Sequence, residues 1–321
     1  MANLLFVNIL GCIMIDVNAK KVNSPIFKII IYLNKYDESV LYDEGLQHLF
    51  KNLNTHFKKL FYMTTYIHKI QKDEDTLKKY NGTAVVSISS IEYCYYKIST
   101  IWDIAYQIAE YLIFPGKLKM KKYDYLNGRF KEYITSRPGL DFKWYIRLNK
   151  IRNRIVHGGI TVNPFYINDD NIKQKICFQA YDFQLNDLIV KNPMYSNVYN
   201  NYINFADYYF TFHTHLLYTF LIDFFEFILI EFNKDKGRDL EELSLSNGIN
   251  EVFESMHKTW LLSDVDVFCK VTQEMISLSL NDGRNMDIDK IPPDKVKAVF
   301  NSFPFSLMRN IIDGDWVLAE K

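Results

Sequence analysis

Three long stretches of this chain are expected to be α-helices, and they constrain the fold more than any other feature. At about residues 42–70 and 85–114, apolar residues recur at helical spacing, and the third stretch, at about 199–232, is strongly apolar. Long helices of this kind are expected to pack against one another. Glycine and proline are scarce, at 12 and 8 of 321 residues, which also disfavours a β protein with many turns. We therefore predict a mainly α protein built as a helical bundle.

The composition allows a large buried core, because 48% of the residues are hydrophobic and 16% are aromatic. The stretch at 199–232 is apolar enough to suggest a membrane span. However, ionisable residues interrupt it, and these favour a buried bundle helix over a transmembrane one. They are Asp207, His213, His215, Asp223 and Glu226. We predict no membrane partner.

Smaller elements are expected around the bundle. Apolar runs at 4–15 and 26–33 predict two N-terminal strands, and 160–192 reads as an extended insert or hairpin. Shorter helices are predicted near 249–262, 264–280 and 293–301. The expected division is N-terminal strands at 1–40, a helical domain at 41–232 with its insert at about 160–195, and a C-terminal helical extension at 233–321.

One short run combines groups that can act on a phosphodiester: Arg152, Asn153 and His157, followed by Gly158 and Gly159. Histidine titrates near neutral pH and can serve as a general acid or base. Arginine stays charged and binds phosphate oxygens with two donors. The run reads as the last turns of a helix that begins at an N-cap, Asp141, and ends at the double glycine. Asn153 and His157 are four residues apart and share one helix face, whereas Arg152 is offset around the helix.

The run lies inside a basic segment of a chain with no net charge. Residues 117–154 carry twelve basic and three acidic residues, a net charge of +9, so the remaining residues carry −9. A local excess of this kind predicts a binding site for a polyanion, with Arg147, Lys150 and Arg154 as binding charges. The alternative is a solvated, lysine-rich loop.

The spacing of Arg152, Asn153 and His157 resembles the R-x4-6-H motif of the HEPN superfamily, in which a polar residue often follows the arginine. The resemblance extends over about residues 42–232. It implies an all-α bundle, usually dimeric, and a metal-independent endoribonuclease of a toxin–antitoxin, abortive-infection or other defence system. It implies RNA as the substrate, an antitoxin or regulatory protein as a partner, and no cofactor or metal. Arg152 and His157 would be catalytic, with Asn153 in support.

Two further expectations follow from this motif. The stretch from Tyr96 to Asp103 resembles the preceding helix of larger HEPN proteins, so Asp103 is a candidate supporting residue. One helix supplies one histidine, whereas cleavage needs both an acid and a base. We therefore expect a homodimer in which two copies of the motif face one cleft.

Other interpretations of these residues stay open. Arg152 and Arg154 are solvated charges, and His157 a C-terminal helix cation, if the chain is a non-catalytic helical dimer that binds nucleic acid or a protein. We interpret His213 and His215 as core or interface residues rather than metal ligands. Three other histidines lie roughly on one face of a predicted helix, and we interpret them as surface or interface residues: His48, His56 and His68. Four widely spaced cysteines predict reduced, buried or half-buried thiols and a cytoplasmic protein.

Overall fold

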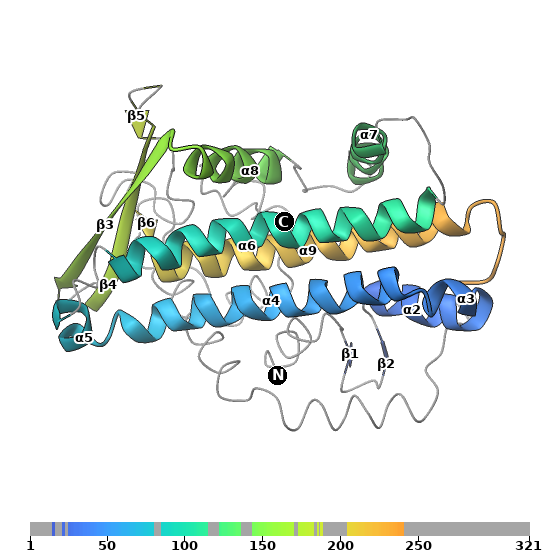
Figure 1. Ribbon diagram of the computed structural model, residues 1–321, viewed down its shortest axis with the longest axis horizontal. Coiled ribbons are helices and arrows are strands. Elements are labelled where there is room, and N and C mark those ends of the chain that lie inside the picture. The colour runs from blue at the N-terminus through green and yellow to red at the C-terminus, as the bar shows by residue number, and fades with distance from the viewer. Residues whose placement is uncertain are drawn as a thin grey trace, which may run out of the picture. The chain divides into compact units, whose positions relative to one another are not determined.

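The computed structural model describes the helices and strands of the chain, with gaps between them (Figure 1). The described residues are 15–16, 21–22, 25–79, 85–114, 122–135, 143–169, 173–182, 185, 187–188 and 204–240. Their helices are α2 (Pro25–Tyr36), α3 (Glu38–Leu41), α4 (Glu44–Ile70), α5 (Glu74–Lys79), α6 (Val85–Ile113), α7 (Lys122–Thr135), α8 (Lys143–Val156) and α9 (Ala206–Asn233). Their strands are β1 (Ile15–Asp16), β2 (Lys21–Val22), β3 (Ile160–Asp169), β4 (Lys173–Asp182), β5 (Asp187–Leu188) and β6 (Asn204–Phe205). Most of these residues are helical, which confirms the prediction of a mainly α protein.

The three long stretches expected to be helical form the three longest helices of the described part. α4 has 27 residues, α6 has 29 and α9 has 28. α9 begins later than predicted, because Asn204 and Phe205 pair with β4 as a short strand. Among the described helices, none combines the length and the apolarity needed to cross a bilayer.

The chain divides into two compact units, and each long helix contributes a part to both. The first unit comprises Met1–Phe61, Thr100–Ile134 and Leu216–Asp266. The second comprises Tyr62–Ser99, Thr135–His215 and Val267–Lys321. Each unit is therefore assembled from segments that are far apart in the sequence.

Aromatic side chains form the core of the first unit. Trp102 of α6 and Phe130 of α7 are completely buried. Both pack against Phe224 of α9, with ring centroids 5.2 and 5.0 Å from its own. At the edge of this core, Arg129 Nη2 of α7 lies 2.7 Å from Glu231 Oε1 of α9. Three helices thus meet at one aromatic cluster. Contacts between rings at these separations stabilise the packing of the helices.

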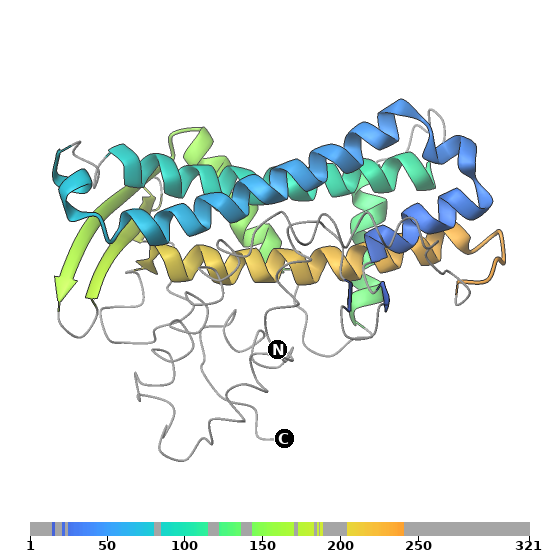
Figure 2. The same cartoon turned by 90° about the horizontal axis from the view of Figure 1, so that it is seen from below.

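Residues 26–33 are helical, so the prediction of a strand there is wrong. Three buried residues of α2, Ile29, Tyr32 and Leu33, follow helical spacing. Tyr32 packs edge-on against Phe232 at 5.7 Å and donates a 2.7 Å hydrogen bond to Asn233 Oδ1, so α2 lies beside the last turn of α9 (Figure 2). The run of isoleucines has a high strand propensity, but this tertiary packing overrides it. Of the other predicted strand, only residue 15 is described, in β1, which pairs antiparallel with β2.

A β-hairpin is the main extended feature of the second unit, which confirms one of the two forms expected for the insert. β3 and β4 pair antiparallel from Ile160 opposite Asp182 to Asp169 opposite Lys173. β5 and β6 extend the sheet by pairing with β4. On β4, Phe178 is fully buried and stacks on Phe210 of α9 at 5.8 Å. The hairpin therefore shares a core with the first turns of α9.

His68 is buried, with 5% of its surface exposed, so the prediction that it is a surface or interface residue is wrong. The last turn of α4 faces the hairpin and α9, where His68 Nδ1 lies 3.6 Å from Asp207 Oδ2. Gln71 donates to the same carboxylate at 2.7 Å. His213 is buried beside the ring of Tyr209 at 4.2 Å, as predicted for a core histidine.

Two of the four cysteines, Cys94 and Cys177, are described, and both are buried free thiols, as predicted. Burial raises the pKa of each thiol, which keeps it protonated and unreactive near neutral pH. Several predicted features lie outside the described residues: the strand residues before 15, the N-cap at Asp141, and the helices expected after 249.

Candidate functional site

The run that carries Arg152 and His157 lies at the end of α8, a helix with one apolar side. Its buried residues Tyr145, Leu148 and Ile155 recur at helical spacing, as the sequence predicted. The helix ends at Val156 and leads directly into β3 (Figure 1). This position places His157 in the turn between a packed helix and the hairpin.

Two glycines stop the helix, as predicted. Gly158 has a φ of 73°, a left-handed conformation that glycine adopts without strain. Its amide donates to the Ile155 carbonyl at 3.3 Å, and the Gly159 amide donates to the Arg154 carbonyl at 2.8 Å. This pair of bonds is the Schellman arrangement, which satisfies the last carbonyls of a helix. It determines where the chain leaves α8 and therefore where His157 lies.

His157 is exposed, whereas Arg152 and Asn153 are partly buried. On an ideal helix, Arg152 points about 140° away from the direction of His157, since each residue turns about 100°. Its guanidinium nevertheless turns toward Asn153, because Arg152 Nη1 donates a 2.7 Å hydrogen bond to Asn153 Oδ1. Asn153 is one turn before His157, and its carbonyl accepts the His157 amide at 3.0 Å. The Arg152 guanidinium is thus directed to the side of α8 that carries His157.

The base of the Arg152 side chain lies next to α6. Arg152 Nε is buried and has no hydrogen-bond acceptor among the described residues. Burial and the nearby Glu92 carboxylate raise the pKa of Tyr96, and the positive charge of Arg152 opposes them. Burial also raises the pKa of Glu92. Tyr96 therefore interacts electrostatically both with Glu92 of its own helix and with Arg152 of α8.

The resemblance placed a supporting residue on the helix segment from Tyr96 to Asp103 and named Asp103. In the structure, Tyr96 interacts with Arg152 of the motif, and Ser99 Oγ donates to Asn149 Oδ1 of α8 at 3.3 Å. Asp103 is exposed and belongs to the first unit, whereas the motif belongs to the second. Its supporting role stays a prediction.

The three predicted binding charges differ in their surroundings. Arg147 and Lys150 are exposed on α8. Arg154 forms an ion pair with Asp182, the last residue of β4, whose side chain is completely buried. Asp182 also accepts a 3.2 Å hydrogen bond from the Leu185 amide. Arg154 therefore has a structural partner, and its charge is partly neutralised.

Comparison with protein families, with curated proteins and with solved structures found no match for this chain. The chemistry of the site therefore rests on its own residues. An exposed imidazole, a guanidinium directed to its side of the helix and two exposed cations can together bind an anion and transfer a proton. Among the residues that the structure describes, no three His, Cys, Asp or Glu side chains gather as a metal site.

Proposed function

We propose that this chain is a HEPN-type, metal-independent endoribonuclease. The observation that carries the proposal is the hydrogen bond from Arg152 to Asn153, which directs the guanidinium to the side of α8 where His157 is exposed. An arginine and a histidine on one exposed surface suit the cleavage of a phosphodiester. The arginine binds the phosphate, and the histidine moves a proton.

In this mechanism, His157 acts as general base and takes the proton of the ribose 2′-OH. The 2′ oxygen then attacks the adjacent phosphorus, and the bond to the 5′ oxygen breaks. Arg152 stabilises the charge that builds up on the phosphate oxygens in the transition state. The leaving 5′ oxygen takes up a proton from a second acid. The products are a 2′,3′-cyclic phosphate and a 5′-OH end.

The second acid in this proposal is His157 of another copy of the chain. One α8 offers one exposed histidine, so a two-fold homodimer is needed to place two of them around one phosphate. Asn153 holds Arg152 in place, and Arg147 and Lys150 bind the flanking phosphates. Such an enzyme would act in cytoplasmic defence, with an antitoxin or regulatory protein controlling it.

The test is cleavage of RNA in EDTA by the full-length protein and by His157→Ala and Arg152→Ala. Each substitution should lower the rate by about 10²- to 10⁴-fold, the usual contribution of one acid–base or charged group. His48→Ala is the matched control, because His48 is an exposed helix histidine outside the motif. Equal cleavage by all four proteins would contradict the mechanism. RNA binding without cleavage, unchanged in His157→Ala, would favour the non-catalytic helical dimer.

A dimeric site makes a second, independent prediction. Adding an excess of His157→Ala to the unaltered protein forms heterodimers that contain one His157. If one cleft needs His157 from both copies, these heterodimers lack either the base or the second acid, and the cleavage rate per unaltered chain falls as the variant is added. An unchanged rate per unaltered chain would indicate that each copy works alone.

A further inference from the structure

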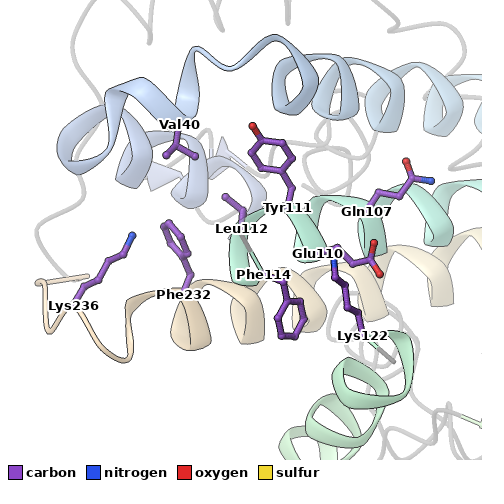
Figure 3. Close-up of a pocket in the computed structure, with 9 residues that line it drawn as sticks. All are labelled: Val40, Gln107, Glu110, Tyr111, Leu112, Phe114, Lys122, Phe232 and Lys236. Carbon is purple, nitrogen blue, oxygen red and sulfur yellow. The ribbon is translucent and has the colours of Figure 1, made fainter. Parts of the chain in front are cut away.

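A hollow of about 570 Å³ lies in the first unit, and none of the motif residues lines it. Its walls come from the last turns of α6, the start of α7, the end of α9 and the turn that follows (Figure 3). The volume is in the range of small-molecule sites, which extend from about 300 to 1,000 Å³. The hollow is therefore large enough for a mononucleotide.

Aromatic rings make up much of the wall. Phe114 and Tyr111 line it from the end of α6, and Phe232 lines it from the end of α9 (Figure 3). Phe114 points to the same side of α6 as Lys122, whereas Tyr111 points to the other side (Figure 3). A purine base stacks on an aromatic ring such as Phe114 whatever its hydrogen-bonding edge.

Polar groups of opposite charge lie at one side of the hollow. Glu110 and Gln107 of α6 are three residues apart on one helix face, and Figure 3 shows Lys122 extending to the same side as Glu110. Within the described part of the chain, Lys122 Nζ has no carboxylate within ion-pair distance. The Glu110 carboxylate can accept two hydrogen bonds, and the Lys122 ammonium beside it can donate one. This pattern matches the hydrogen-bonding edge of guanine. That edge presents two adjacent N–H donors and the O6 acceptor.

A cation with an ordered side chain lies at the opposite side, beside Phe232 (Figure 3). Lys236 Nζ lies 3.6 Å from the centroid of the Phe232 ring and 2.9 Å from Asp37 Oδ2. Arg238 Nη1 also lies 2.7 Å from Asp37 Oδ2. Two cations therefore share one carboxylate, and the Lys236 ammonium has further donors beyond the one directed at Asp37. Such a donor can bind a phosphate oxygen.

We propose that this hollow binds a guanine mononucleotide. The base stacks on Phe114, with its N1–H and amino group donating to Glu110 and its O6 accepting from Lys122. The phosphate lies at Lys236. The proposal does not depend on the ribonuclease mechanism, because it uses none of the motif residues.

The experiment is calorimetric titration of the full-length protein with GMP, AMP, UMP and inorganic phosphate. GMP should bind about tenfold or more tightly than AMP, because adenine presents an acceptor where guanine presents the N1–H donor. Glu110→Gln should lower the affinity for GMP by a similar factor and leave circular dichroism unchanged. Lys122→Met should do the same, whereas Lys51→Met and Glu38→Gln, on exposed helix positions of the same unit, should have no effect.

Several outcomes would overturn the proposal. Equal affinity for GMP and AMP would reduce the site to an unselective aromatic hollow, and equal affinity for phosphate alone would reduce it to an anion site. Binding only to an RNA that ends in guanosine, and not to GMP, would also contradict a mononucleotide site. His157→Ala should bind GMP as the unaltered protein does, so loss of cleavage and loss of GMP binding are read out separately.

Discussion

Lys175 Nζ of β4 lies 2.6 Å from Asp207 Oδ2 of α9, and the two side chains are 4% and 0% exposed. Lys175 Nζ also lies 3.8 Å from the centroid of the Tyr208 ring. Burial by itself raises the pKa of Asp207, but attraction to Lys175 and hydrogen bonds from His68, Lys175 and Gln71 outweigh it and hold the pKa below its usual value. The pair connects the hairpin with α9, and Gln71 connects both with α4.

Replacing one partner of this pair should destabilise the protein strongly. Lys175→Met leaves the Asp207 carboxylate buried without its cation, which typically costs about 3–5 kcal/mol. The free energy of unfolding in urea measures the loss. Lys78→Met is the matched control: Lys78 pairs with Glu74 at 2.7 Å, but its side chain is 72% exposed, so unfolding should be nearly unchanged.

The double variant Lys175→Met, Asp207→Asn separates pairing from packing. Without a charge on either residue, no buried ion is left uncompensated, so the double variant should be more stable than the sum of the single effects predicts. Additive effects would mean that the ion pair itself contributes little and that the two side chains act through packing alone.

The stability of the second unit should fall in mild acid because of His213. Burial lowers the pKa of His213 to about 3, whereas an unfolded chain binds that proton near pH 6.5. Between these values the unfolded state holds one more proton than the folded state, so stability is lost as the pH falls from 6.5 toward 3. The slope for one proton is about 1.4 kcal/mol per pH unit.

Urea unfolding at a series of pH values, on the unaltered protein and on His213→Phe, measures this effect. Between pH 6.5 and 4, the free energy of unfolding of the variant should depend less steeply on pH, by the amount that one proton accounts for. Identical profiles for the two proteins would show that His213 takes up its proton without unfolding.

Arg154→Ala should lower stability, whereas Arg147→Ala should not. Without Arg154, the buried Asp182 carboxylate keeps the Leu185 amide but loses its cation, and we expect a loss of about 1–3 kcal/mol. Arg147 is exposed on α8, so its removal should instead weaken RNA binding and reduce the dependence of that binding on salt. Urea unfolding and filter binding at several salt concentrations distinguish the two roles. Equal stability of both variants would assign Arg154 to the substrate instead of the fold.

Gly158→Ala should destabilise the end of α8 by about 1–2 kcal/mol, the cost of a left-handed backbone for a residue with a Cβ. No atom lies within 4 Å of the position that the new Cβ would occupy, so the cost is conformational and not steric. Gly158→Asn should cost less, since asparagine tolerates this conformation better. Thermal unfolding ranks the three proteins, and an alanine variant as stable as the original would contradict the strain.

Periodic apolar residues were sufficient to predict α4, α6 and α8, because the buried side of each helix repeats along the sequence at helical spacing. α9 was predicted from its length and apolarity, since it is buried on nearly all sides. The Gly158 stop was equally readable, since a left-handed residue needs glycine. Residues 26–33 show the limit of local patterns. Their isoleucines favour a strand, and only contact with the end of α9 makes them helical.

The sequence alone determined the long helices α4, α6 and α9, the helix α8, and which residues can bind a phosphate or move a proton, because periodicity, apolarity and side-chain chemistry are local. Tertiary structure decided which charges remain available. It buried Lys175 and Asp207 together, paired Arg154 with Asp182, and brought Tyr96 into the electrostatic surroundings of Arg152. These relationships join residues that are far apart along the chain. Desolvation and charge pairing depend on distance in space, which no local pattern contains.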